Sequence, residues 1–217
     1  MERVFSDQMK LFDPDKTGDP VHIIGAGGIG NMLVLLLAKM GFSEIHVWDD
    51  DDFEARNGPT EVAYSEKLVG QKKVDVARAT VDWLVGDSVK FVTHCERVTA
   101  ETELSGYVIS GVDSMASRKE IWQAVLKNAL QVLLYIDARS AGQEVQILSV
   151  LPFSPDEVDA YETWLFDDSE ASGLACGARN IGYMATYIAS IVGYNLARFI
   201  NGGQIEFNIQ RDLSAGI

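Results

Sequence analysis

The run "VHIIGAGGIGNMLVLLLAKMG", residues 21–41, restricts the possible fold more than any other part of the chain. Three of its first four residues are apolar, and the four together have the length of a short buried strand. A turn with the spacing GxGxxG follows, formed by Gly25, Gly27 and Gly30. An apolar stretch of helical length comes next, and Gly41 suits the C-terminal end of a helix. A strand, a glycine turn and a helix in this order predict the first unit of a nucleotide-binding α/β domain.

The rest of the chain continues to alternate strand-like and helix-like segments. Further strands are predicted at residues 45–48, 90–94, 107–110 and 132–136, and helices at 64–85, 117–130 and 181–199. The run "DARSAGQEVQILSVLP" reads as a strand, a turn and a returning strand, and residues 204–209 alternate like a final strand. The acidic segment 154–172 has no clear period and is predicted to be a surface loop.

These segments predict one domain over residues 1–217. We expect a Rossmann-like α/β fold: a mostly parallel sheet with helices on both faces and an antiparallel C-terminal extension. The chain carries 18 Lys and Arg against 32 Asp and Glu, a net charge of −14, and it has no basic run. Such a chain repels nucleic-acid phosphates and anionic lipid surfaces, so no nucleic acid or membrane partner is expected.

The N-terminal segment lacks the apolar core of a signal peptide, and the longest apolar stretch is too short to span a bilayer. This predicts a cytoplasmic protein. The two cysteines, Cys95 and Cys176, lie far apart outside any CxxC pattern. That count excludes a disulfide scaffold and a four-thiolate zinc site. The three histidines fall in predicted strands without metal-ligand spacing and are expected to pack there.

Four consecutive aspartates follow the second predicted strand. Asp49 lies 19 residues after Gly30, where an acid normally binds the ribose of a nucleotide, whether NAD or ATP. The backbone of the glycine turn is expected to approach the phosphates at Gly25, Gly27, Gly28 and Gly30. Asp50 and Asp52 alternate away from this site and are expected to face solvent. The turn and the first aspartate therefore leave the identity of the nucleotide open.

Three later features have no role in a dehydrogenase. Asp49, Asp51 and Asn57 form the pattern DxDxxxxxN, Lys73 closes "GQKK", and Asp113 and Arg118 give DxxxxR in "SGVDSMASR". Taken in this order, the motifs resemble the ThiF/MoeB superfamily, adenylyltransferases related to ubiquitin-activating enzymes. The resemblance runs from about residue 21 to the C-terminus, and the ordered set is far more specific than GxGxxG alone.

The resemblance implies an enzyme that binds ATP and Mg²⁺ and activates a carboxylate. Such enzymes join AMP to the C-terminal carboxylate of a small ubiquitin-like or sulfur-carrier protein, release pyrophosphate, and work as homodimers. Carried over to this sequence, Asp49 would bind the ribose, Asn57 and Lys73 the triphosphate, and Asp113 the Mg²⁺. Asp51 would belong to the same nucleotide-binding set. The reaction itself requires these residue types, because a carboxylate that attacks a phosphate needs nearby positive charge and a fixed geometry.

The sequence departs from the family pattern at two places. The family motif N-x-x-R-Q is replaced by "NGPTE", with Thr60 where an arginine contacts the phosphates. A guanidinium is thereby lost, and Arg56, or Arg3 of a partner subunit, is the candidate replacement. The zinc-binding cysteine pairs of many members are also missing, which predicts a compact variant without zinc.

Cys176 precedes the last predicted helix, where the family often carries a cysteine. It is either a catalytic thiol for a thioester or persulfide step, activated by the helix end and Arg179, or a small buried side chain. Cys95 is expected in the core. Two other functions stay open: a nucleotide-binding module without catalysis and an NAD-dependent oxidoreductase.

Overall fold

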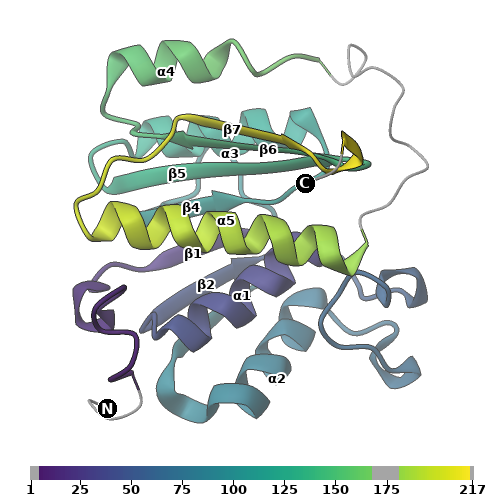
Figure 1. Ribbon diagram of the computed structural model, residues 1–217. Helices are drawn as coiled ribbons and strands as arrows, with labels where there is room; N and C mark the ends of the chain where they lie inside the picture. The colour runs from purple at the N-terminus through teal and green to yellow at the C-terminus, as the bar shows by residue number, and fades with distance from the viewer. Residues whose placement is uncertain (1–4, 168–180, 216–217) are drawn as a thin grey trace.

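Figure 1 shows the computed structural model, which describes residues 5–167 and 181–215. It contains a seven-stranded sheet in the order β3-β2-β1-β4-β5-β6-β7. The strands are β1 (Val21–Ile24), β2 (Glu44–Trp48), β3 (Lys90–His94), β4 (Gly106–Ser110), β5 (Val132–Ala141), β6 (Glu144–Val150) and β7 (Asn208–Asp212). The helices described are α1 (Gly28–Met40), α2 (Lys73–Val85), α3 (Met115–Lys127), α4 (Pro155–Glu162) and α5 (Gly182–Ile200).

Strand direction in the sheet matches the fold expected from the sequence. β1 pairs in parallel with β2 and β4, and the parallel arrangement extends to β3 and β5. β6 runs antiparallel to both β5 and β7. The strand order reverses between β1 and β4, and ligands of open α/β sheets bind in the crevice at such a point. The predicted Rossmann-like fold with an antiparallel extension is confirmed.

Helices cover both faces of the sheet (Figure 1). α1, α2 and α5 pack against one face and α3 and α4 against the other, each pair of layers enclosing its own apolar core. Side chains along β4 alternate between the two cores. Tyr107 and Ile109 pack in the core under α1, α2 and α5, whereas Val108 packs in the core under α3 and α4. None of the described helices is long and apolar enough to cross a membrane.

Three elements differ from the sequence-based prediction. The final strand, expected at residues 204–209, is found at Asn208–Asp212 as β7. The helix expected at residues 64–85 begins only at Lys73, because the preceding segment is held by other contacts: the backbone N–H of Lys73 donates to Asp51 O at 3.1 Å, and Asp52 and Lys72 form a β-bridge. The acidic segment predicted as a loop contains α4. Ser154 is the N-cap of this helix, Pro155 begins it, and acidic side chains occupy its first turn, which together are helix start signals.

Cysteine and histidine placements also test the sequence analysis. Cys95 is exposed, so its prediction as a core residue is wrong; β3 ends one residue earlier, at His94. The histidines do pack in strands as expected. His22, His46 and His94 form a stack with Trp48, in which His46 Nδ1 and His94 Nε2 lie 3.0 Å apart.

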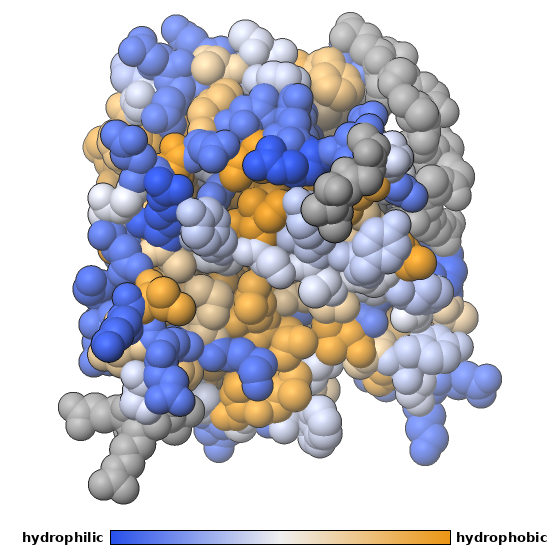
Figure 2. All heavy atoms as spheres, viewed as in Figure 1, coloured by the Kyte–Doolittle hydropathy of each residue, from blue (hydrophilic) through white to orange (hydrophobic). Residues whose placement is uncertain are grey.

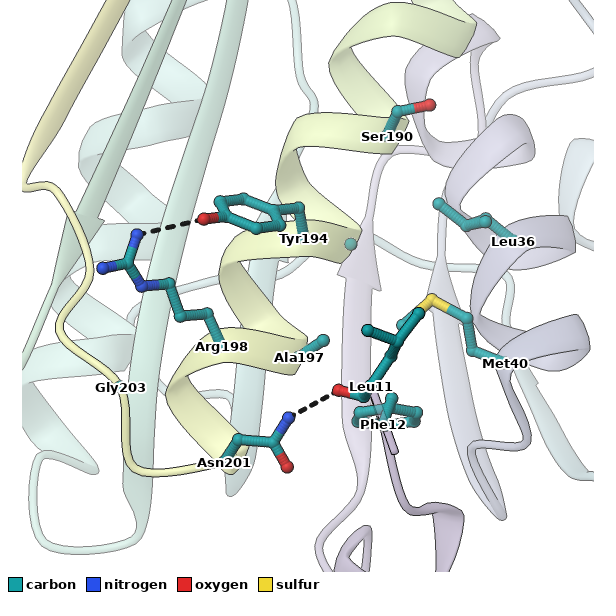
Figure 3. A pocket seen from close by; sticks show the side chains of 11 residues that line it. Leu11, Phe12, Leu36, Met40, Ser190, Tyr194, Ala197, Arg198, Asn201 and Gly203 are labelled. Carbon is teal, nitrogen blue, oxygen red and sulfur yellow. Dashed lines mark hydrogen bonds between the residues drawn. The ribbon is translucent and has the colours of Figure 1, made fainter. Parts of the chain in front are cut away.

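Apolar side chains gather over α1 and α5 on the face seen in Figure 2. An open groove of about 610 Å³ lies there between these helices and the N-terminal segment (Figure 3). Its lining includes Leu11, Leu36, Met40, Gly193 and Tyr194. Leu11 and Tyr194 are 80% and 58% exposed, so the groove presents large apolar surfaces to solvent.

Candidate nucleotide site

The glycine turn connects β1 to α1 by a very close backbone approach. Gly25 has a φ of 96°, a conformation that favours glycine, and its N–H donates to Trp48 O at 2.8 Å. A Cβ on Gly30 would lie 1.8 Å from Gly25 O, so no other residue fits. Gly27 is the N-cap of α1 and makes no side-chain capping bond. The first N–H groups of α1 therefore point to where an anion could bind.

Asp49 is fixed beside this turn by two backbone hydrogen bonds. Its carboxylate accepts from the N–H of Ala26 at 2.7 Å and from the N–H of Asp51 at 2.8 Å. Burial raises the pKa of Asp49, while the charge of Lys73 and these two N–H groups act in the opposite direction. The end of β2 thus holds an oriented acid against the glycine turn, as the sequence predicted for a ribose-binding residue.

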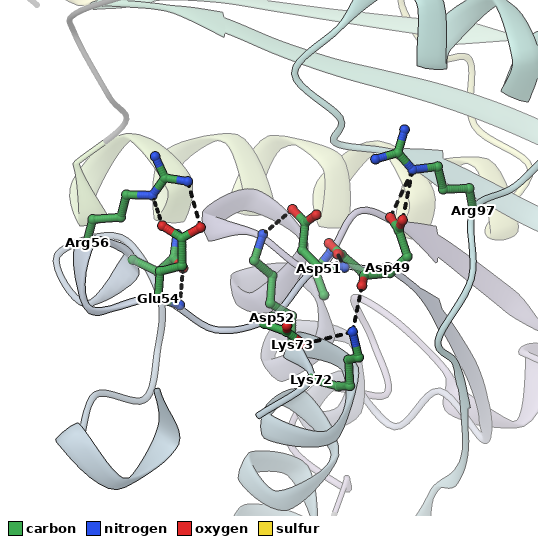
Figure 4. A network of polar contacts seen from close by, with 11 residues as sticks. Asp49, Asp51, Asp52, Glu54, Arg56, Lys72, Lys73 and Arg97 are labelled. Carbon is green, nitrogen blue, oxygen red and sulfur yellow. Dashed lines mark hydrogen bonds and ion pairs between the residues drawn. The ribbon is translucent and has the colours of Figure 1, made fainter. Parts of the chain in front are cut away.

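Lys73 begins α2 and directs its ammonium group back toward the aspartates (Figure 4). Nζ donates to Asp51 Oδ2 at 2.8 Å, and the Lys73 side chain is only 11% exposed. Burial alone would lower the pKa of Lys73, but the hydrogen bond to Asp51 and the nearby carboxylates raise it. The hydrogen bond to Lys73 in turn lowers the pKa of Asp51. Lys73 is therefore a fixed, fully charged cation next to Asp49.

The other two aspartates of the run, Asp50 and Asp52, face solvent as expected, but each binds a cation. Figure 4 shows Asp52 beside Lys72. The single Nε–H of Arg97 is shared between both carboxylate oxygens of Asp50, each 3.0 Å from Nε. Asp52 pairs with Lys72 at 2.7 Å, and Lys72 also donates to Asp50 O at 3.0 Å. These contacts tie the acidic run to the segments after β3 and before α2.

The loop between β4 and α3, which carries Asp113, lies on the side of the glycine turn opposite the end of β2. A Cβ built on Gly25 would lie 3.2 Å from Gly111 O, so the loop touches the turn. Ser114 caps α3 by accepting from Ser117 N at 3.2 Å, which leaves the exposed Asp113 outside the helix cap. The sequence brings Asp113 to this edge of the site because it follows a strand that neighbours β1.

A network of buried charged side chains contacts the backbone of that loop. Arg118 donates to Val112 O at 2.6 Å, and its Nε lies 3.4 Å from Asp137 Oδ1. Asp137 is fully buried and also pairs with Arg139 at 2.7 Å and accepts from Tyr161 OH at 2.9 Å. Burial opposes ionisation, but the two arginines outweigh it and lower the pKa of Asp137. Arg118 was predicted only as part of a spacing, and Asp137, the acid that pairs with it, was not predicted from the sequence.

Asn57 and Arg56 are occupied within their own short turn, Ala55–Asn57. Asn57 Oδ1 accepts from the N–H of Glu54 at 2.7 Å, and the Arg56 guanidinium donates to the Glu54 carboxylate at 2.7 Å. Thr60, in place of the family arginine, packs against the glycine turn, 3.1 Å from a Cβ built on Gly28. Their roles toward a triphosphate stay predictions.

Glu61 was missed by the sequence analysis. It is 6% exposed, and neither carboxylate oxygen has a hydrogen-bond partner among the described residues. Burial raises the pKa of Glu61 to about 7. The charge of Lys73 acts to lower this pKa, and the charge of Asp49 acts to raise it. A glutamate in a polar segment is normally expected in solvent. The available signal was its place in "NGPTE", where Glu61 follows Thr60 and stands at the position of the glutamine in N-x-x-R-Q.

Carboxylate oxygens that suit a hard cation gather at Asp49, Asp50 and Asp51, whose ligand atoms lie within 4.8 Å of one another. Two of them already hold Arg97 and Lys73, which compete with a metal ion. Asp113 is not part of this group, and its predicted role as the Mg²⁺ ligand stays a prediction. Cys176, Arg179 and Arg3 lie outside the described residues.

The site combines a glycine turn at a helix N-terminus, a carboxylate oriented by backbone N–H groups and a fixed cation beside it. The ThiF family model matches residues 18–213 of the chain. The chain belongs to the ThiF family. This confirms the resemblance inferred from the ordered motifs.

Individual relatives of this ThiF-family chain agree with that assignment. It is 26% identical over 200 residues to the sulfur carrier protein ThiS adenylyltransferase of Escherichia coli K12, covering 90% of this chain and 75% of that protein. It is 30% identical over 103 residues to the adenylyltransferase and sulfurtransferase MOCS3 of Aedes aegypti, covering 45% of this chain and 23% of that protein. The chain thus spans about a quarter of the MOCS3 length.

A solved structure shows the same fold. The E. coli MccB structure with AMPCPP and MccA superimposes with a TM-score of 0.72 at 18% identity, covering 93% of this chain and 63% of the MccB chain. At that identity the likeness concerns the fold alone. The names of the relatives agree with the prediction of an adenylyltransferase-type protein.

Proposed function

We propose that this ThiF-family protein is an ATP-dependent adenylyltransferase. It would activate the C-terminal carboxylate of a small ubiquitin-like or sulfur-carrier protein as an acyl-adenylate and release pyrophosphate. The observation that carries this proposal is Lys73, a buried cation held by Asp51 beside the ribose-type acid Asp49. A hydride-transfer enzyme has no use for such a cation, whereas a triphosphate does. The adenylyltransferase names of the two relatives support the same reaction.

The residues of the candidate site would each have a part in this reaction. The first N–H groups of α1 would receive a phosphate, and Asp49 would accept hydrogen bonds from the ribose hydroxyls. Lys73 would leave Asp51 to bind phosphate oxygens. Asp113 would hold Mg²⁺, which neutralises phosphate charge when it is bound. No general base is needed, because the attacking carboxylate is ionised at neutral pH.

The first test compares nucleotides and two adjacent lysines. Wild-type protein should gain thermal stability with ATP and Mg²⁺ and little with NAD. Lys73→Ala should lower ATP–pyrophosphate exchange, measured with a candidate carrier protein that ends in Gly-Gly, by about a hundredfold or more, since one phosphate-facing charge contributes about 3 kcal/mol. The matched control is Lys72→Ala, which removes an exposed neighbour paired with Asp52. Stabilisation by NAD alone would refute the proposal.

The second candidate function is a nucleotide-binding module without efficient turnover. It is favoured by Thr60 in place of the family arginine and by the pairing of Arg56 with Glu54, which keeps the nearest guanidinium occupied. This candidate predicts that ATP binds normally while no pyrophosphate exchange occurs with any carrier. An NAD-dependent oxidoreductase would leave Lys73 and Asp113 without roles.

The apolar groove between α1 and α5 supports a further part of the proposal, a two-fold homodimer. The exposed side chains of Leu11 and Tyr194 would be covered by the same face of a second copy. A cytoplasmic location, expected from the sequence, is part of the same proposal.

A further inference from the structure

Glu61 has an unusual environment next to the proposed nucleotide site. Both of its carboxylate oxygens are buried, and neither has a hydrogen-bond partner among the described residues. Its backbone N–H donates to Asn57 O at 3.1 Å, and the preceding residue, Thr60, packs against Gly28 of the phosphate-binding turn. The chain therefore holds this side chain in place through its backbone and leaves its polar end unsatisfied.

Two charged groups act on Glu61. Lys73, from the start of α2, favours its ionised form, and Asp49, from the end of β2, disfavours it. On its own segment, Arg56 is paired with Glu54. Burial outweighs Lys73, so the pKa of Glu61 rises to about 7. Glu61 is thus a carboxyl group that can change its protonation at neutral pH.

A bound nucleotide would shift this balance in one direction. Its phosphates bring negative charge to the cation that helps Glu61 ionise, and like charge nearby favours the protonated form of a carboxyl group. A protonated carboxyl group can donate a hydrogen bond, whereas an ionised one can only accept. Phosphate and ribose oxygens are acceptors. An unsatisfied buried carboxylate would then gain a partner, which removes a cost of the empty site.

We propose that Glu61 is a nucleotide-binding residue that holds its ligand as a neutral carboxylic acid. It takes one proton from solvent and donates its O–H to an oxygen of the bound nucleotide. This inference rests on the proposed function, since it needs a nucleotide in the site, but it concerns binding and not adenylyl transfer.

The test counts protons during nucleotide binding. Titration calorimetry with AMPCPP and Mg²⁺ is repeated in buffers of different ionisation enthalpy at about pH 8, one unit above the pKa of Glu61, where most of the acid is ionised before binding. Wild-type protein should take up nearly one proton more than Glu61→Gln. Its affinity should weaken up to about tenfold per pH unit above neutrality, while the affinity of Glu61→Gln stays constant. Glu66→Gln, at an exposed position, is the matched control and should behave like wild type.

The outcomes separate this inference from the proposed function. Equal proton uptake by wild type and Glu61→Gln would overturn the role of Glu61 while leaving the nucleotide site intact. Proton release on binding at about pH 6, one unit below the pKa of Glu61, together with weakened Mg²⁺ dependence in the variant, would make Glu61 a metal ligand and also overturn the inference. Absence of AMPCPP binding to wild type would reject the proposed function and this inference together. Glu61→Met, which has similar length and no proton to bind, replaces the amide variant if that one unfolds.

Discussion

At the scale of single residues, the proposed nucleotide site contains more negative than positive charge. Asp49, Asp51 and Glu61 surround one cation, Lys73, and the strongest contact of that cation is with Asp51. A phosphate arriving at the site would compete with Asp51 for Lys73. The imbalance is a property of the site itself, because Asp50 and Asp52 are matched by Arg97 and Lys72 outside it.

The unsatisfied acid predicts a pH-dependent stability for the protein without nucleotide. The pKa of Glu61 is 4.5 as a model value and about 7 in the fold, so between these values the folded state binds more protons than the unfolded state. The free energy of unfolding contributed by this group therefore falls as pH rises from about 4.5 to 7 and stays low above that. Glu61→Gln should raise the melting temperature clearly at pH 8 and little at pH 5. An equal gain at both pH values would contradict the burial of an ionising group.

Two further substitutions separate adenylation from later sulfur chemistry. Asp113→Ala should abolish ATP–pyrophosphate exchange if that residue holds the metal. Cys176→Ala should leave exchange intact, since a thiol is not needed to form an acyl-adenylate, and should remove only a thioester or persulfide product. Wild-type exchange in Asp113→Ala would mean that the metal is held elsewhere. Lost exchange in a folded Cys176→Ala would make that cysteine part of nucleotide binding.

Residues that follow a spacing rule were predictable, and residues that depend on burial were not. The glycines, Asp49 and Lys73 lie where the motifs predict, and their contacts agree with a nucleotide site. Glu61 could not be found this way, because its burial comes from a fold around it and not from its neighbours in sequence. The same reason explains the wrong prediction for Cys95.

At the scale of elements, contacts between segments decide where helices begin. A helical period runs through residues 64–85, but the backbone pairing of Lys72 and Lys73 with the acidic run holds the first part in another conformation. The late start places Lys73 in the first turn of α2, where its ammonium group contacts Asp51. α4 was missed for the opposite reason: its start signals are local, but an acidic, weakly periodic sequence concealed them.

The connection between β1 and α1 gives a sharp test at this scale. Gly30→Ala would place a methyl group 1.8 Å from Gly25 O, and backbone cannot move aside cheaply, so we expect a loss of about 3 kcal/mol in the free energy of unfolding. Gly27→Ala is the matched control, because a Cβ there meets nothing within 4 Å and the φ of −74° suits alanine. Denaturant unfolding measures both. Similar stabilities of the two variants would contradict the close approach.

At the scale of the whole molecule, strand order brings distant motifs together. The glycine turn follows β1, Asp49 follows β2 and Asp113 follows β4, and these strands are neighbours in the sheet. This arrangement was predictable because parallel strands with crossover helices follow few topologies. The apolar groove over α1 and α5 was predictable only as excess apolar surface, not in its shape.

The homodimer proposal is tested by sedimentation at micromolar concentration. Wild-type protein should be a dimer, and Tyr194→Asp should shift it toward monomer, because the charge would be buried in the contact. Leu130→Asp serves as the control: this side chain is 94% exposed and does not line the groove. A wild-type monomer would reject the proposal, as would dissociation caused by the control alone.

The place of β1 in the sheet also has a consequence for the order of folding. β1 lies between β2 and β4, and its second partner follows only after α2 and β3 along the chain. During synthesis, β1 therefore has an open edge until residues 106–110 can pair with it, and an open edge invites wrong partners. The glycine turn already has the acid and the lysine beside it at that stage. The proposed site is complete only when the loop after β4 packs against the glycine turn. It therefore forms late, although most of its residues are synthesised early.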